Sequence, residues 1–459
     1  MKVVVFNGSP KGELSVTLQY VRYLQKKFPQ HEFTIYPIAQ QINKLERDAQ
    51  AFGQIMDEVR HTDAVIWAFP LYFLLVCSQY KRFIELIREK NEASAFAGKY
   101  AASLSTSIHF FDHTAHNYIH AICDDLQMKY LGAYSAEMYD LMRGKERRRL
   151  LGFAESFFDS VSRQIPVARV YPPLSFSDFH YQPGTSTASV DTGNKQLLIL
   201  TDEKKESGNL WPMVQSFKGN FRQNVDVVCL SDIDIKGGCL GCCRCGLNNI
   251  CTYEGKDGFI DFYNTRVKKA DVVVFAGAIH DRYLSSRWKT YFDRSFFNTH
   301  TPTLKGKQIA FLIAGPLGQI PNLRQILVAY GEFQEANLVG IVTDEAGDSR
   351  EIDQLLKELA VSLVRPAVEG YTRPMTFLGV GGRKIFRDEV WGKLRFVFQS
   401  DHRYYKAHGL YDFPYKNFKM RRMNLLMTML TKIPPFRKKF IKVLKEQMVK
   451  PLQGVVENK

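Results

Sequence analysis

The stretch Phe6-Asn7-Gly8-Ser9-Pro10-Lys11-Gly12-Glu13-Leu14-Ser15-Val16-Thr17 decides how this chain folds. Residues 2–6 before it are apolar and β-branched, which is typical of a buried strand, and residues 15–27 after it predict a helix. A strand that turns through Gly and Ser into a helix points several backbone N–H groups at one place, where the positive helix end favours an anion. The stretch is neither a P-loop nor a dinucleotide-binding pattern. It predicts a phosphate site of another kind, with an ordinary βα turn as the alternative.

Strand and helix patterns alternate from this loop to about residue 170. Strands are expected at residues 2–6, 33–37, 63–69, 100–105 and 130–134, with helices near 14–27, 46–60, 75–90, 112–127 and 144–163. A run of βα units of this size predicts one doubly wound domain whose parallel sheet has the order 2-1-3-4-5. Ligands of such domains bind at the carboxyl ends of the strands.

Two further patches follow strands of this domain. Pro70-Leu71-Tyr72-Phe73 comes after the third expected strand, and Ser105-Thr106-Ser107 comes after the fourth. Because the carboxyl ends of parallel strands lie at one edge of the sheet, we expect both patches to lie near the first loop. Taken alone, the first patch also suits a pair of core aromatic residues, and the second suits a turn.

The loop Asn7-Gly8-Ser9-Pro10-Lys11, with Ser15 and Thr17, resembles the FMN phosphate loop of the flavodoxin-like NAD(P)H-dependent FMN reductases. The Pro70-Leu71-Tyr72-Phe73 patch is similar to the segment of that family that contacts the isoalloxazine ring. The resemblance covers about the first 170 residues and implies FMN as cofactor and NAD(P)H as co-substrate. The residues that it assigns to the cofactor are Ser9, Lys11, Ser15, Val16, Thr17, Pro70, Leu71, Tyr72, Phe73, Ser105, Thr106 and Ser107.

The alternation of strands and helices restarts after a linker. Residues 171–194 are rich in Pro, Gly, Ser and Thr, and new strands are expected at 196–200, 225–229, 271–275, 308–313 and 339–343. We therefore predict an α/β protein with two tandem flavodoxin-like doubly wound sheets and a helical, basic C-terminal extension. The expected parts are residues 1–170, 171–194, 195–370 and 371–459. Two unrelated α/β domains are the alternative to an internal duplication.

Five of the eight cysteines fall between Cys239 and Cys251, in the pattern C-x2-C-x2-C-x5-C with one extra cysteine. Two-residue gaps let successive thiolates turn towards one centre, which suits an iron–sulfur cluster or zinc. The pattern resembles that of the iron–sulfur flavoproteins, which belong to the same flavodoxin-like reductases. This resemblance implies a [4Fe–4S] cluster on Cys239, Cys242, Cys245 and Cys251, while zinc, free thiols and a redox disulfide are the alternatives.

The two halves differ in a complementary way. The second half has the cysteines, but Asp202, Glu203 and Glu206 stand where its phosphate loop would be, and their negative charge disfavours a phosphate. We expect FMN in the first domain and the cluster in the second, packed as a pseudo-dimer that brings the two groups close.

Four histidines, His109, His113, His116 and His120, follow the Ser105-Thr106-Ser107 patch at helical spacing. Because histidine titrates near neutrality, His109, His113 and His116 are predicted to bind substrate or donate a proton. A solvated or capping stripe of histidines is the alternative, and a metal site with Asp112 is a weaker one.

The chain carries a formal net charge of +15, most of it near the C-terminus. Residues 401–459 contain 14 Lys and Arg against 4 Asp and Glu, a net of +10, mixed with bulky apolar residues. Such a tail complements an anionic membrane surface or an acidic protein. The alternative is a helical extension that packs on the second domain. No nucleic-acid-binding motif accompanies the charge, so nucleic acid is not expected as a partner.

These patterns together predict a cytoplasmic FMN-dependent oxidoreductase, because neither a secretion signal nor a membrane-spanning run is visible. It would move electrons between NAD(P)H or a protein donor, FMN and the [4Fe–4S] cluster, and on to a small-molecule or protein acceptor. One alternative is an NAD(P)H:quinone or flavin reductase without a cluster. The other is an electron-transfer or redox-sensing flavoprotein that is not an enzyme.

Overall fold

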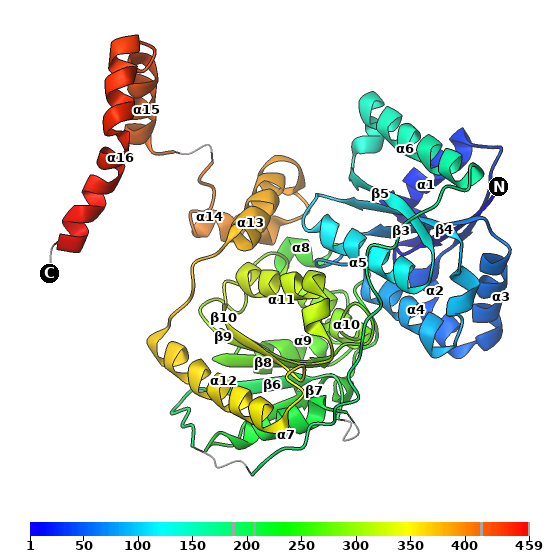
Figure 1. Ribbon diagram of the computed structural model, residues 1–459, viewed down its shortest axis with the longest axis horizontal. Coiled ribbons are helices and arrows are strands. Elements are labelled where there is room, and N and C mark those ends of the chain that lie inside the picture. The colour runs from blue at the N-terminus through cyan, green and yellow to red at the C-terminus, as the bar shows by residue number, and fades with distance from the viewer. Residues whose placement is uncertain (186–188, 205–207, 414–415, 458–459) are drawn as a thin grey trace. The chain divides into compact units, whose positions relative to one another are not determined.

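The computed structural model describes residues 1–185, 189–204, 208–413 and 416–457. The chain divides into two compact units, Met1–Tyr404 and Tyr405–Lys459. The first of these, here called the main unit, contains two five-stranded parallel sheets with helices on both faces (Figure 1). Glu206, for which we expected repulsion of a phosphate, lies outside the described residues.

The first sheet has the strand order β2-β1-β3-β4-β5, as predicted. Its strands are β1 (Lys2–Asn7), β2 (Glu32–Tyr36), β3 (Ala64–Pro70), β4 (Tyr100–Ser107) and β5 (Lys129–Glu137). All neighbouring strands run parallel, and Val3 of β1 pairs with Phe33 on one side and Ala64 on the other. The carboxyl ends of β1 and β3 therefore lie together at the point where the strand order reverses.

Helices cover both faces of this sheet. One face packs on α1 (Val16–Lys27) and α6 (Gly144–Ser162), and the other packs on α2 (Ile38–Arg47), α3 (Ala49–Arg60), α4 (Ser78–Glu89) and α5 (Asp112–Asp125). The sequence did not predict α2, because its apolar face is carried by few residues. Its buried side chains are Ile38, Ala39, Ile42 and Leu45, which repeat at helical spacing over only ten residues.

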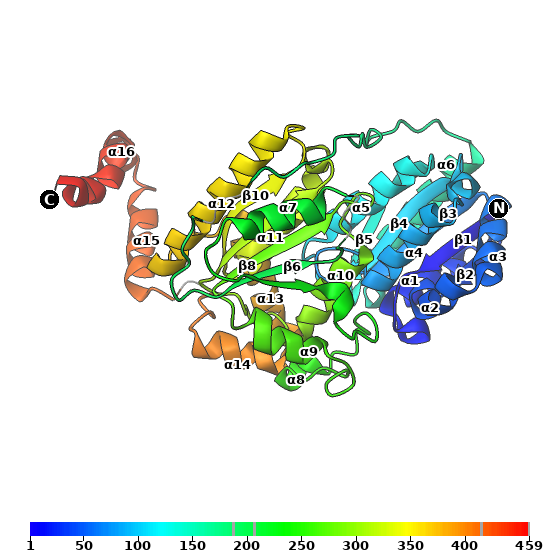
Figure 2. The ribbon, with the colours of Figure 1, turned by 90° about the horizontal axis from the view of Figure 1, so that it is seen from below.

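The second sheet repeats the topology of the first, with the order β7-β6-β8-β9-β10. Its strands are β6 (Leu197–Thr201), β7 (Asp226–Cys229), β8 (Val272–Ala278), β9 (Gln308–Ala314) and β10 (Asn337–Thr343). Helices α7 (Leu210–Gly219) and α12 (Ser349–Glu369) cover one face, and α10 (Ser286–Ser295) and α11 (Pro321–Phe333) cover the other (Figure 2). The prediction of two tandem doubly wound sheets is confirmed.

The two domains share one hydrophobic core, which runs through α4 of the first domain and α10 of the second. The polar contacts across this interface are reciprocal. The backbone N–H of Ser78 donates to Asp293 Oδ2 at 2.7 Å, and that of Ser286 donates to Glu85 Oε1 at 2.6 Å. Each carboxylate also pairs with a buried lysine one turn away on its own helix. The interface therefore has the self-complementary form of a twofold dimer within one chain.

The chain after the second domain returns to the main unit. Helix α13 (Phe377–Glu389) is followed by a π-helical turn, Val390–Leu394, and by α14 (Gln399–Ala407). The glycines in Gly379-Val380-Gly381-Gly382 predict a turn from the sequence, but this prediction is wrong, because these residues lie inside α13. A Cβ on Gly382 would come within 2.5 Å of the Phe110 ring, so glycine here lets the helix approach the first domain closely.

Residues 405–459 form the second compact unit, here called the C-terminal unit. It contains α15 (Phe418–Leu430) and α16 (Pro434–Glu457). Within the described ranges, no helix is both long enough and apolar enough to cross a membrane.

Candidate active site

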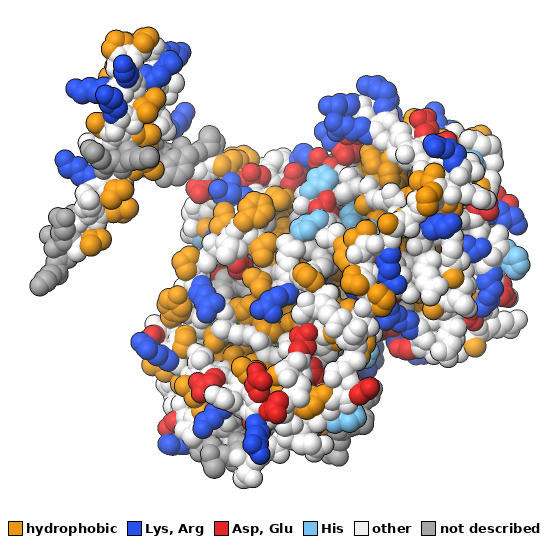
Figure 3. Space-filling view, viewed as in Figure 1, with side chains coloured by type: hydrophobic (Ala, Val, Ile, Leu, Met, Phe, Trp, Pro, Cys, Tyr) orange, Lys and Arg blue, Asp and Glu red, His pale blue; other side chains and the backbone are white. Residues whose placement is uncertain are grey.

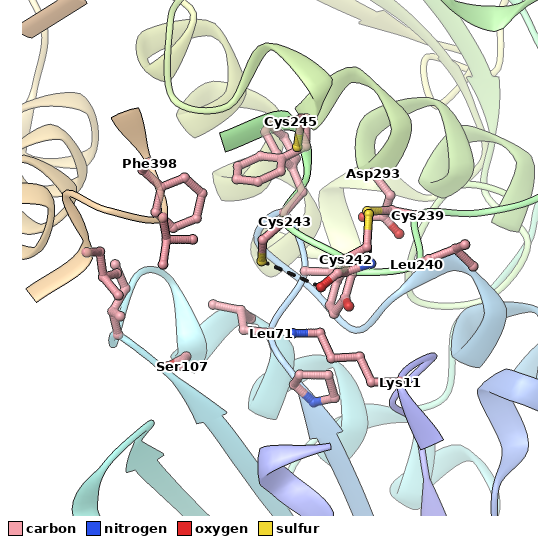
Figure 4. Close-up of a pocket in the computed structure, with 18 of the residues that line it drawn as sticks. Lys11, Leu71, Ser107, Cys239, Leu240, Cys242, Cys243, Cys245, Asp293 and Phe398 are labelled. Carbon is pink, nitrogen blue, oxygen red and sulfur yellow. Dashed lines mark hydrogen bonds between the residues drawn. The ribbon is translucent and has the colours of Figure 1, made fainter. Parts of the chain in front are cut away.

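A cavity of about 560 Å³ lies between the two domains, at the carboxyl ends of β1, β3 and β4. Its volume falls in the range of roughly 300–1,000 Å³ that is usual for cofactor and ligand sites. The first domain contributes the predicted residues Ser9, Lys11, Ser15, Val16, Pro70, Leu71, Tyr72, Phe73, Thr106 and Ser107. The second domain contributes all five clustered cysteines, and Figure 4 shows Cys239, Cys242 and Cys243 beside Lys11 and Leu71.

The first loop has the form expected of an anion site. Ser15 caps α1, since its Oγ accepts the N–H of Leu18 at 3.2 Å. The N–H groups of the first helical turn, beginning at Val16, have no carbonyl partner within the helix. Ser9 and Lys11 line the cavity in front of this turn. The side-chain amide nitrogen of Asn7, Nδ2, lies at the start of the loop and is buried without a hydrogen-bond partner among the described residues.

The segment Pro70–Phe73 is held in shape by the second domain. Phe73 and Leu74 adopt positive φ angles of 28° and 65°, which are costly for side chains of this size. The ring of Phe73 stacks on Phe292 at 6.1 Å between centroids, and Lys289 donates a hydrogen bond to the carbonyl of Tyr72 at 3.1 Å. Packing by the second domain therefore stabilises the turn that lines the centre of the cavity.

Two predicted cofactor residues lie behind the wall of the cavity. The hydroxyls of Thr17 and Thr106 are 2.6 Å apart, and Ser105 Oγ is 2.8 Å from His116 Nε2. Thr17 and Ser105 are buried and are not among the lining residues. Thr17 supports Thr106 through the contact between their hydroxyls. Ser105 precedes Thr106 and Ser107 in β4 and supports them through the backbone of the strand.

The cysteine loop of the second domain packs directly against the first domain. A Cβ on Gly241 would overlap the Tyr72 hydroxyl and lie 3.0 Å from Lys11 Cε. Gln79 of α4 donates to the carbonyl of Cys239 at 3.1 Å. Arg294 donates to the carbonyl of Gly237 at 2.9 Å and so fixes the base of the same loop. The loop closes the cavity over the residues that resemble a flavin site.

Burial controls the protonation of groups on this side of the cavity. It raises the pKa of the Cys245 thiol to about 12, with the neighbouring Cys251 thiol adding to the effect. Burial also raises the pKa of Cys239 and of the Tyr72 hydroxyl. Burial therefore favours the protonated form of all three groups.

The four predicted metal ligands line one cavity but are not gathered around one point. Across the described residues, no group of three or more His, Cys, Asp or Glu side chains is arranged to hold a single metal ion. None of the eight cysteines forms a disulfide. Cys242 is exposed, and Cys243 has a positive φ of 56° that turns the chain between Cys242 and Cys245. The donor set is chemically suited to iron and sulfide, which span a larger volume than a single ion.

The predicted catalytic histidines are not brought together at the cavity. His116 is buried between the hydroxyls of Ser103 and Ser105, and burial lowers its pKa to about 4. His109 is half exposed and paired with Asp112 at 2.9 Å, and this bond raises the pKa of His109. His113 is exposed, and its Nε2 is 3.3 Å from the side chain of Gln325.

Several lining residues were missed by the sequence analysis. Phe110 follows the third loop, and its ring lies 5.5 Å from Phe333 and 4.5 Å from Phe386. Its place after a strand was a usable signal, because such positions meet at the sheet edge. Phe386 and Phe398 come from the segment after the second domain, and no local pattern connects that segment to the cavity.

The corresponding loop of the second domain is built differently. Asp202 is buried there and accepts a hydrogen bond from Ser285 Oγ. Burial raises the pKa of Asp202 to about 6, and its second carboxyl oxygen has no partner in the described part of the chain. An acidic side chain thus directly follows the first strand of the second domain, where Gly8 and Ser9 follow β1 in the first domain.

Comparison with known proteins agrees with this geometry for the first domain. Residues 1–138 match the family model described as NADPH-dependent FMN reductase. No curated protein matched. FerB, a flavoenzyme NAD(P)H:(acceptor) oxidoreductase from Paracoccus denitrificans, is 22% identical over 35% of this chain and 97% of its own, with a TM-score of 0.30. An FMN-dependent NADH-azoreductase from Bacillus anthracis is 12% identical over 36% of this chain and 100% of its own, with a TM-score of 0.26. The family match therefore relates the first domain, about a third of the chain, to the NADPH-dependent FMN reductases.

Proposed function

We propose that this protein is an NAD(P)H-dependent flavin oxidoreductase that holds FMN in the cavity between its two domains. The observation that carries the proposal is the joining of three elements in one cavity: a helix N-terminal loop, the Pro70–Phe73 segment and the end of β4. The match of residues 1–138 to the NADPH-dependent FMN reductase family supports the same conclusion.

The residues of the cavity suit a flavin mononucleotide. Ser9, Lys11 and Ser15, with the free N–H groups at the start of α1, are the donors available to a phosphate. Leu71 and Tyr72 provide a wall for a flat ring. Bound FMN supplies the hydride and electron chemistry, and the protein binds the ring, orients it and excludes water from it.

The cysteine motif is proposed to hold a [4Fe–4S] cluster on Cys239, Cys242, Cys245 and Cys251. The support comes from the donor set, four thiols lining the cavity that receives the flavin, and from the close packing of Gly241 on Tyr72. A cluster at this place would lie within the same cavity as the flavin.

A second candidate is an NAD(P)H:quinone or flavin reductase whose cysteines remain free thiols. The observation that favours it is that the match to the NADPH-dependent FMN reductase family covers residues 1–138 and does not reach the cysteine loop. The cytoplasmic location is kept as a proposal, and eight free cysteines suit a reducing compartment. Of the three histidines, His109 is proposed for contact with the substrate, because its backbone N–H donates to Ser107 Oγ at 2.9 Å and Ser107 lines the cavity.

The first experiment is an absorption spectrum of protein purified without oxygen, with iron and sulfide assays and NAD(P)H consumption. Flavin bands with about four iron atoms per chain would support both cofactors. Flavin bands without iron would favour the second candidate. Protein without any flavin, and without affinity for added FMN, would overturn the proposal.

Cys242→Ser separates the two candidates further, with Cys229→Ser as the matched control. Cys229 is buried outside the cysteine loop. If the cluster is present, the first variant loses iron and the control keeps it. Equal iron content in both variants would remove Cys242 from the ligand set.

A further inference from the structure

Helices α15 and α16 do not bury most of their large apolar side chains within the C-terminal unit itself. Helix α15 has no buried residue at all. Phe418 is 74% exposed, Leu425 is 59% exposed and Leu426 is 57% exposed. The same holds in α16, where Ile441 is 62% exposed and Met448 is 68% exposed. Globular proteins rarely expose so many neighbouring apolar groups unless another surface covers them.

Helix α16 carries a row of apolar side chains along its length. The apolar side is marked by residues three or four apart, namely Phe436, Phe440, Leu444, Met448, Leu452 and Val455. Phe436 and Phe440 stack at 6.3 Å between centroids, which shows that this spacing places them together. Lys438, Lys439 and Lys442 lie between these residues along the chain. The helix therefore presents a row of apolar side chains with cations close to it.

Exposed cations surround these apolar groups. Arg421 and Arg422 of α15, and Lys438, Lys439 and Lys442 of α16, are all exposed. Figure 3 shows basic and apolar side chains interspersed on these helices. Because residues 401–459 carry a net charge of +10, the unit matches a partner with a dense negative charge.

A solvated basic arm is the simplest interpretation of the charge, but it does not account for the apolar side chains of this segment. A solvated basic arm would not need leucine, methionine and valine in such numbers. An acidic surface that also accepts apolar side chains meets both requirements, and an anionic bilayer has these properties.

We propose that residues 405–459 bind the surface of an anionic lipid bilayer. Helices α15 and α16 lie in the interface, with their apolar side chains among the upper acyl chains and their Lys and Arg side chains on the lipid phosphates. Cofactor binding and catalysis in the main unit do not enter the argument, so the proposal stands or falls separately from the proposed function.

Co-sedimentation of the full-length protein with vesicles tests the proposal. The vesicles contain either phosphatidylcholine alone or a mixture with phosphatidylglycerol. We expect binding to the mixed vesicles, weak binding to phosphatidylcholine, and release of the protein at high salt. Equal binding to both vesicle types, or no binding to either, would overturn the proposal.

Two double variants examine the two components of the binding. Lys438→Glu with Lys439→Glu reverses two charges, and at about 1 kcal/mol per basic residue the lipid concentration for half-binding should rise at least roughly 25-fold. Leu425→Ser with Leu426→Ser should weaken binding at both low and high salt, because it removes apolar contact. Lys26→Glu with Lys27→Glu, an adjacent exposed pair in α1, is the matched charge control and should bind as the unchanged protein does.

An acidic protein is the competing occupant of this surface. It is tested with polyglutamate of defined length under the same salt conditions. Tight binding to polyglutamate, together with failure to bind the mixed vesicles, would overturn the lipid assignment in favour of an acidic protein. Circular dichroism and NAD(P)H consumption of each variant report whether the main unit is intact.

Discussion

Gly241 of the second domain lies so close to Tyr72 of the first that no side chain fits between them. A Cβ on Gly241 would overlap the Tyr72 hydroxyl, and its other close neighbour is Lys11 Cε at 3.0 Å. The two residues belong to different domains, yet both line one cavity. The contact therefore makes the shape of the proposed flavin site depend on the position of the cysteine loop.

Gly241→Ala should weaken FMN binding by displacing this loop. Overpacking of this kind costs roughly 1–3 kcal/mol, which corresponds to about a 5- to 150-fold higher Kd. Fluorescence titration of FMN into the apoprotein measures the change. The matched control is Gly255→Ala, because Gly255 has a similar φ of 69° but no atom within 4 Å of its Cβ position. A similar loss of affinity in both variants would mean that backbone strain, not the contact with Tyr72, is responsible.

Lys11→Met should lower the affinity for FMN while leaving the affinity for riboflavin unchanged. Lys11 lines the cavity beside the start of α1, where the phosphate of FMN is proposed to bind. Riboflavin lacks this phosphate, so it should not use the cation of Lys11. A hydrogen bond to a charged group contributes roughly 1.5–3 kcal/mol, or about a 10- to 150-fold change in Kd for FMN. Equal losses for both ligands would place Lys11 at the ring and not at the phosphate.

Glu85→Ala should destabilise the main unit strongly. Glu85 is buried, pairs with Lys81 at 2.7 Å and accepts the N–H of Ser286 across the domain interface at 2.6 Å. Its removal leaves the buried Lys81 with one carboxylate, Asp281 at 3.0 Å, and leaves the N–H and hydroxyl of Ser286 without their acceptor. Together these losses should cost about 3–5 kcal/mol. Glu89→Ala removes an exposed carboxylate from the same helix and should cost at most about 1 kcal/mol. Urea unfolding of both variants gives the comparison, and equal midpoints would contradict the role of Glu85.

His116 should make the protein less stable as the pH falls. Burial lowers its pKa to about 4, whereas an unfolded histidine has a pKa of about 6.5, so between these values the unfolded chain binds more protons. Above the pKa of histidine in the unfolded chain, His116 is neutral in both states and does not reduce the free energy of unfolding. Between pH 7.5 and pH 5 about 2 kcal/mol of it is lost.

His116→Gln removes this titration, so its unfolding free energy should fall by about 2 kcal/mol less than that of the unchanged protein over the same pH range. Replacement of the exposed His61 by Gln serves as the control. Urea unfolding at both pH values makes the measurement. Identical pH dependence in the unchanged protein and in His116→Gln would show that His116 is not held neutral by burial.

The sequence predicted the elements whose apolar residues form continuous runs or recur at a regular spacing. Strands such as β3 and β8 are continuous apolar runs, and the alternation with helices identified both sheets and their order. The sequence-based prediction was wrong at residues 379–382, where the glycines suggested a turn. These residues lie in α13, and glycine at 382 allows the helix to pack against Phe110. Close approach between distant segments, which explains those glycines, is not a local property of the sequence.

The candidate site was predictable only where its residues follow strands. Ser9, Leu71 and Ser107 were found for this reason, and the structure places all three at one cavity. His116 was chosen for its chemistry, but the hydroxyls of Ser103 and Ser105 hold it inside the domain. Phe386 and Phe398 line the cavity because the segment after the second domain folds back onto the main unit. No local sequence pattern predicts where such a segment packs.

The reciprocal bonds of Ser78 to Asp293 and of Ser286 to Glu85 have a consequence for how such a site can evolve. In a dimer of identical subunits, every mutation appears twice, so one site cannot change while its twin is kept. A covalent pair of domains removes this constraint, and it also keeps the site assembled at any dilution because the partner is always attached. One half is then free to keep the anion loop while the other replaces it with Asp202 and gains the cysteines.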